Sequence, residues 1–193
     1  MDRAGWANVS AARDTRWQTD LNKMTLRFTP PQPDPAAAPQ RGGAPVGALH
    51  ELSPIELAAI VYLRAWCAGG ADRGMIARDF QLVLGDGASP FVKDFDDLMT
   101  TVLENARRPV MRHGLGCTCF GGDESVFANL VAAAAAQDRD DALLFASTLM
   151  RGHAAWAAVE LSMRLGQVFL RLARMPNQGP SPTHDLQQTL YKH

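Results

Sequence analysis

Apolar residues between positions 49 and 176 recur every three or four residues, which is the spacing of one face of an α-helix. The first such segment opens with Ser53-Pro54-Ile55-Glu56. A serine N-cap, a proline at the first helical position and a glutamate at the third form the capping-box pattern of a helix start. We therefore predict a helix from this segment to Gly69-Gly70. Its expected core face consists of Ile55, Ala59, Tyr62, Leu63 and Trp66.

The same spacing predicts further helices along the rest of this region. They are expected at residues 72–84, from 89 to before 109, from 123 to before 138, at 143–150 and at 153–175. Gly85 and Pro109 are the kinds of residue at which helices end. No polar-apolar alternation is longer than four residues, so the predicted fold class is all-α. We expect a globular bundle of about six helices with a Gly/Cys-rich turn between the third and the fourth.

The two ends of the chain lack this helical spacing. Residues 30–45 are rich in proline and carry no apolar periodicity, so they cannot hold a helix. We predict that residues 1–48 form a flexible N-terminal arm and Pro-rich linker, and that residues 49–176 form the helical domain. Residues 177–193 are expected to form a flexible C-terminal tail.

Composition and charge narrow the classes of function. Apolar residues make up 47% and charged residues 20% of the chain, which is typical of a single packed core. The formal net charge of −1 gives no global field to attract nucleic acid or an anionic membrane, and no apolar run is long enough to cross a bilayer. Three cysteines without a secretory signal favour a cytoplasmic protein. The presence of 16 Arg against 3 Lys favours a GC-rich bacterial genome.

The candidate chemistry lies in the segment HGLGCTCFGGDE, which begins at His113. Together with Cys67, the residues His113, Cys117 and Cys119 supply one nitrogen and three sulfurs, the ligand set of a tetrahedral zinc site, and iron is the other candidate metal. Most zinc-binding cysteine pairs are separated by about two to four residues rather than one. A second interpretation is a thiol–disulfide pair formed by Cys117 and Cys119. The third is that all three cysteines are structural.

Other polar clusters have structural interpretations. The basic run from Arg107 to His113 suits the C-terminal end of a helix. The acidic clusters at 94–97 and 138–141 suit solvated helix faces and helix starts. No nucleophile stands in a known triad motif and no phosphate loop follows a predicted strand, so the sequence gives no support to an enzyme.

The last predicted helix is apolar on most of its surface, and such a helix lies either at the centre of a domain or at an interface. We expect Trp156, Met163, Phe169 and Leu170 to form a surface for a protein partner or a homodimer. The predicted function is a cytoplasmic, non-enzymatic interaction or regulatory protein without a cofactor. The alternative is a small metal-binding (zinc or iron) or thiol-redox-responsive protein that uses the Cys-x-Cys turn.

Overall fold

The computed structural model describes residues 42–174, and 74% of these residues are helical, which confirms the all-α class. Most of the predicted arm and linker, and the predicted tail, lie outside the described residues. The helices are α2 (Pro54–Ala68), α3 (Gly70–Leu84), α4 (Ala88–Glu104), α5 (Gly122–Ala135), α6 (Arg139–Leu149) and α7 (Gly152–Leu172). Within residues 42–174, no helix combines the length and the apolarity that a membrane span requires.

Local sequence signals account for several helix ends. The Ser53 side chain accepts a hydrogen bond from the Glu56 backbone N–H (3.4 Å), and the Glu56 carboxylate accepts one from the Ser53 N–H (2.8 Å), so the predicted capping box is confirmed. Gly85 ends α3 with a φ of 59°, a backbone conformation that glycine adopts without steric cost. Gly69 alone separates α2 from α3, with a φ of 75°.

The helix predicted to continue towards Pro109 ends earlier, at Glu104. Asn105 donates from its side chain to the carbonyl of Thr101 (3.0 Å) and so occupies one of the last acceptors of α4. The chain then leaves the helix, and the N–H of Arg107 donates to the carbonyl of Leu149 at the end of α6 (2.9 Å). Pairing with a distant segment therefore replaces the last helical turn that the spacing predicted.

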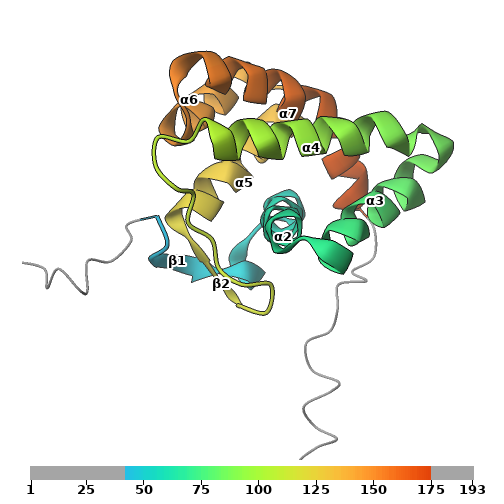
Figure 1. The fold of residues 1–193 in the computed structure, drawn as a ribbon, viewed down its shortest axis with the longest axis horizontal. Coiled ribbons are helices and arrows are strands. Elements are labelled where there is room, and N and C mark those ends of the chain that lie inside the picture. The colour runs from blue at the N-terminus through green and yellow to red at the C-terminus, as the bar shows by residue number, and fades with distance from the viewer. Residues whose placement is uncertain (1–41, 175–193) are drawn as a thin grey trace, which may run out of the picture. The chain divides into compact units, whose positions relative to one another are not determined.

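The helices surround α2, which is seen end-on near the middle of Figure 1, and α4 and α7 lie across it. Four aromatic rings from α2, α3, α4 and α7 form the centre of this packing. All pairs among these rings have centroid distances of 6.0–6.5 Å, mostly in edge-to-face or tilted arrangements. The four residues are Tyr62, Phe80, Phe95 and Phe169.

Tyr62 is the polar member of this aromatic cluster. Its hydroxyl reaches Asp79 on α3 and donates a hydrogen bond to the carboxylate (3.0 Å). Burial, and next the negative charge of Asp79, raise the pKa of Tyr62 far above its ordinary value. The hydroxyl is therefore protonated at any physiological pH and acts as a fixed donor between α2 and α3.

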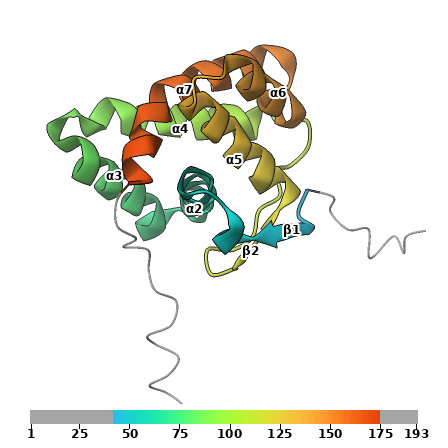
Figure 2. The ribbon, with the colours of Figure 1, turned by 180° about the vertical axis from the view of Figure 1, so that it is seen from behind.

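A two-stranded antiparallel sheet, which the sequence did not predict, lies beside the N-terminus of α5 (Figure 2). It pairs β1 (Pro45–Ala48) with β2 (Cys119–Gly121), so that Ala48 lies opposite Cys119 and Gly47 opposite Phe120. The described fold thus begins at Gly42, within the segment that we assigned to the linker. These strands are too short to show an alternating pattern, and their pairing joins segments far apart in the chain.

Candidate functional site

A buried arginine organises the loop of residues 113–121, which we call the Gly-Cys loop. Arg64 lies on α2 and is 2% exposed. Its Nε and Nη2 donate to the carboxylate of Glu124 on α5 (2.6 and 3.0 Å). Nη1 donates to the carbonyls of Gly114 and Cys117 (3.2 and 2.8 Å), and Nη2 donates to that of Cys119 (2.7 Å). All five N–H groups of the guanidinium therefore have an acceptor.

Glu124 is the matching acceptor and is fully buried. Besides Arg64 it binds the backbone N–H of His113 (3.0 Å), Nδ1 of the same imidazole (2.8 Å) and the N–H of Gly121 (2.8 Å). Burial works to raise the pKa of Glu124, but the hydrogen bonds from Arg64, His113 and Gly121 outweigh it and hold the pKa below its ordinary value. The carboxylate therefore stays ionised and holds both ends of the loop.

A second ion pair fixes the approach to the loop. Asp123, at the start of α5, is 4% exposed and binds both terminal nitrogens of Arg108 at 2.7 Å, as well as the backbone N–H of Met111 (2.9 Å). The carbonyl of Gly42 accepts from the Asp123 N–H (3.0 Å). Arg108 therefore neutralises a buried carboxylate on α5; it is not in the last turn of a helix, as its position before Pro109 had suggested.

The two loop thiols belong to residues separated only by Thr118, and both are half-buried. The contact between the two side chains holds the pKa of Cys117 below its ordinary value and raises that of Cys119. The chain bends at Thr118, between them. Residues two apart are separated by at most about 7 Å between Cα atoms, close to the upper limit for a disulfide of roughly 6.8 Å. A small backbone adjustment would therefore allow the two sulfurs to bond.

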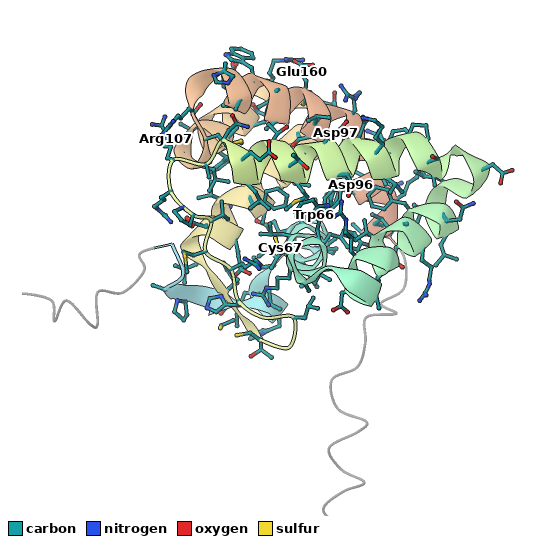
Figure 3. The ribbon with its side chains drawn as sticks, viewed as in Figure 1. Trp66, Cys67, Asp96, Asp97, Arg107 and Glu160 are labelled. Atoms are coloured by element: carbon teal, nitrogen blue, oxygen red, sulfur yellow. The ribbon has the colours of Figure 1, made fainter. Side chains whose placement is uncertain are left out.

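Cys67 is on α2, as labelled in Figure 3, one turn after Arg64, and it is half-buried. Burial raises the pKa of its thiol, and the positive charge of Arg112 opposes the rise. Among residues 42–174, no group of three or more His, Cys, Asp and Glu side chains is arranged to hold a metal ion. The imidazole of His113 is instead bound to Glu124. The structure thus does not bring His113, Cys117, Cys119 and Cys67 together as a ligand set, and metal binding stays a prediction.

The residues predicted to form an interaction surface on α7 are divided between core and surface. Phe169 is fully buried in the aromatic cluster and offers no surface to a partner, because its ring packs among helices of the same domain. Met163 and Leu170 are half-buried. Trp156 is 51% exposed and is the one residue of the four with a largely open side chain. The apolar width of α7 is therefore explained mainly by its central position.

A shallow cavity of about 150 Å³ lies beside the second ion pair. Arg107 and Arg108 line it together with Asp123, Thr148 and Leu149. The Nε of Arg107, a residue labelled in Figure 3, donates to the carbonyl of Ser147 (3.1 Å). The carboxylate of Asp123 neutralises Arg108, while Arg107 keeps one positive charge at the cavity.

Sequence reasoning missed Arg64, the residue on which the loop geometry depends. Arg64 follows Ile60 by four residues and precedes Cys67 by three, so it lies within an apolar face of α2. An arginine on the apolar face of a predicted helix indicates a buried ion pair, because a buried arginine needs a carboxylate partner. The partner could not be identified from the sequence, since Glu124 is 60 residues away.

The chemistry available at this site belongs to the thiols, because Arg64, Glu124 and Asp123 all have their charges neutralised by fixed partners. All three cysteines are free. Comparison with known proteins gives no match to a family model, to a curated protein or to a solved structure.

Proposed function

We propose that the Gly-Cys loop is a thiol–disulfide centre, and that the protein responds to the oxidation state of Cys117 and Cys119. The Cys117 thiolate attacks one sulfur of a disulfide oxidant, forms a mixed disulfide and expels the first thiolate of the oxidant. The Cys119 sulfur then attacks Cys117, loses its proton and expels the second thiolate. The loop gives up two electrons and two protons, and the oxidant is reduced to two thiols.

The observation that carries this proposal is the placement of two half-buried thiols, one residue apart, on a loop whose carbonyls are held by one buried guanidinium. The lowered pKa of Cys117 supports its role as the attacking sulfur, since the thiolate is the nucleophile. The half-buried Cys67, whose pKa is raised by burial, is expected to react more slowly.

Equilibration with glutathione buffers of increasing oxidised fraction tests the proposal. Thiol titration with a maleimide under denaturing conditions, followed by peptide mass spectrometry, counts the free cysteines at each step. We expect two thiols to be lost together and the disulfide to map to Cys117 and Cys119, while Cys67 remains free. The Cys67→Ser variant is the matched control and should give the same midpoint.

Two results would contradict the redox proposal. One is a protein that keeps all three thiols under oxidising buffers in which a dithiol with the potential of thioredoxin, about −270 mV, is fully oxidised. The other is a disulfide that forms only between molecules, seen as a dimer on non-reducing gels. A Cys119→Ser variant should instead stop at the mixed disulfide with glutathione, because the resolving thiol is absent.

The predicted metal site needs a separate measurement. Zinc or iron bound by His113, Cys117, Cys119 and Cys67 would appear in elemental analysis of protein purified without added metal. The Cys117→Ser/Cys119→Ser double variant would lose it. Absence of stoichiometric metal from both proteins contradicts this alternative.

A homodimer or protein partner is the second candidate function, and the exposed Trp156 favours it, because tryptophan is enriched at the centres of interfaces. Sedimentation velocity over a range of concentrations tests the homodimer. We expect Trp156→Ala to raise the dissociation constant of the homodimer about tenfold or more. The matched control Leu82→Ala, which truncates a side chain on α3 with 64% exposure, should leave it unchanged. A wild type that stays monomeric throughout contradicts the homodimer.

A further inference from the structure

Three consecutive carbonyls in the Gly-Cys loop bind two different parts of the fold. Those of Cys117 and Cys119 accept hydrogen bonds from Arg64 (2.8 and 2.7 Å). The carbonyl between them, on Thr118, accepts from the backbone N–H of Leu49 (2.8 Å), immediately after β1. The backbone that joins the two cysteines is therefore held by the core on one side and by the N-terminal strand on the other.

We expect formation of a disulfide to disturb the hydrogen bonds of the carbonyls around Thr118. A disulfide requires Cβ atoms about 3.5–4.5 Å apart, and bond lengths and peptide planes are rigid. The adjustment therefore falls on four backbone torsions, which are ψ of Cys117, φ and ψ of Thr118, and φ of Cys119. Rotation there turns the two adjoining peptide groups, which carry the carbonyls of Cys117 and Thr118. We expect at least one of the two hydrogen bonds to lengthen.

The two hydrogen bonds differ in how readily they can be broken. Arg64 is buried, so loss of its bond to Cys117 leaves a charged donor without an acceptor and without water. Leu49 is half-buried, but Thr118 is exposed, and the sheet beside them has only two short strands. Water can replace the carbonyl for the Leu49 N–H. The bond to Leu49, the residue that follows β1, is thus the one expected to break.

We propose that oxidation of the Cys117–Cys119 pair releases β1 from β2, so that the docking of residues 45–49 reports the redox state of the loop. This inference rests on the proposed thiol–disulfide function. The coupling is reciprocal: a docked β1 favours the dithiol, and a partner or mutation that loosens β1 favours the disulfide. Arg64 acts here as a positioning residue, because it holds the carbonyls on both sides of the bend.

Amide hydrogen exchange of the reduced and the oxidised protein tests the release directly. Both samples are made from the Cys67→Ser variant, and thiol titration of each confirms its state. We expect the Leu49 amide to exchange about tenfold faster, or more, in the oxidised form. The amide of Val102, buried in α4, is the internal control and should exchange at the same rate in both forms.

A glycine substitution in β1 tests the reciprocal effect. A Cβ added to Gly47 would lie 2.8 Å from the Phe120 ring and 2.9 Å from the Glu51 carboxylate, so Gly47→Ala should weaken docking. We expect the equilibrium constant for disulfide formation in glutathione buffers to rise about tenfold, which is a potential lower by about 30 mV. Gly74→Ala, where nothing lies within 4 Å of the new Cβ, is the matched control with no expected change.

The possible outcomes separate the two proposals. Free thiols at 117 and 119 in every oxidising buffer overturn the thiol–disulfide function, and this coupling with it. A disulfide that forms while Leu49 exchange stays the same overturns the coupling alone. An unchanged midpoint in Gly47→Ala likewise overturns the coupling and leaves the redox centre in place.

Discussion

Arg64 makes more hydrogen bonds than an ion pair requires, and their distribution indicates its role. Two of its five N–H groups bind Glu124, and the other three bind carbonyls of the Gly-Cys loop. A buried ion pair contributes little net stability once desolvation is counted. Apolar side chains would fill the same space at lower cost, but they could not hold three carbonyls in fixed positions. The residue is thus best explained by the loop conformation that it imposes.

Ser162 differs from Arg64 because its buried polar group has no hydrogen-bond partner among the described residues. Its hydroxyl is fully buried in α7. We predict that Ser162→Ala raises the free energy of unfolding by about 1 kcal/mol, because it removes an unsatisfied hydroxyl and adds a stronger helix former. Urea denaturation monitored by circular dichroism measures the change.

The same substitution elsewhere in the chain provides the control. Ser53 caps α2 with its side chain, so Ser53→Ala should lower the free energy of unfolding by about 1 kcal/mol. The changes in the free energy of unfolding of the two variants are therefore expected to have opposite signs. A loss of stability in Ser162→Ala would show that the hydroxyl has a partner in solution.

At the scale of elements, the helices were predictable and the sheet was not. The capping box at Ser53 and the positive φ at Gly85 act within a few residues, so the sequence carries them directly. The pairing of β1 with β2 depends on contacts between residues 45–48 and 119–121, which no local pattern encodes. Within the candidate site, the pair Cys117 and Cys119 could be predicted from the sequence. The role of Arg64 could not, because the apolar spacing of α2 shows only that a charged residue interrupts it. Only the fold brings Arg64 to Glu124.

The contact between α5 and α7 depends on a glycine that the apolar pattern does not mark. A Cβ added to Gly166 would lie 2.9 Å from the Cα of Ala135 and 3.1 Å from the carbonyl of Ala134, both of them backbone atoms. We predict that Gly166→Ala lowers the free energy of unfolding by about 1–3 kcal/mol, because the two helices must separate. Thermal and urea unfolding measure the loss.

Gly74→Ala is the matched control for this helix contact. Gly74 lies in the exposed interior of α3 with open space around it, and alanine there should raise stability by about 0.5–1 kcal/mol. Equal effects of the two variants would contradict the view that α5 and α7 meet at backbone contact distance.

At the scale of the whole domain, α2 belongs to two centres of packing. Through Tyr62 it joins the aromatic cluster with α3, α4 and α7. Through Arg64 it joins Glu124 on α5 and the Gly-Cys loop. The two residues are only two positions apart and point to different sides of α2. Because one helix carries both centres, a change in the charge of the second centre is expected to weaken the cooperative unit as a whole.

The pH dependence of unfolding follows from Glu124. Its pKa in the folded protein lies below the ordinary value of 4.5, so the unfolded chain takes up a proton first as the pH falls. The stabilising contribution of the carboxylate is therefore complete above pH 4.5 and is lost as the pH falls through the folded-state pKa. Glu124→Gln removes this contribution at every pH and leaves Arg64 buried without its charge partner. At neutral pH we expect a cost of about 3–5 kcal/mol.

The measurement is urea unfolding of wild type and Glu124→Gln at a series of pH values from neutral to acid. The difference between their free energies of unfolding should be constant above pH 4.5 and should shrink below it, because only the wild type loses an ionised carboxylate there. Glu104→Gln, at the exposed end of α4, is the matched control and should stay within about 0.5 kcal/mol of wild type at neutral pH. A difference for Glu124→Gln that is as large at about pH 3 as at neutral pH would mean that the carboxylate is not the group that titrates.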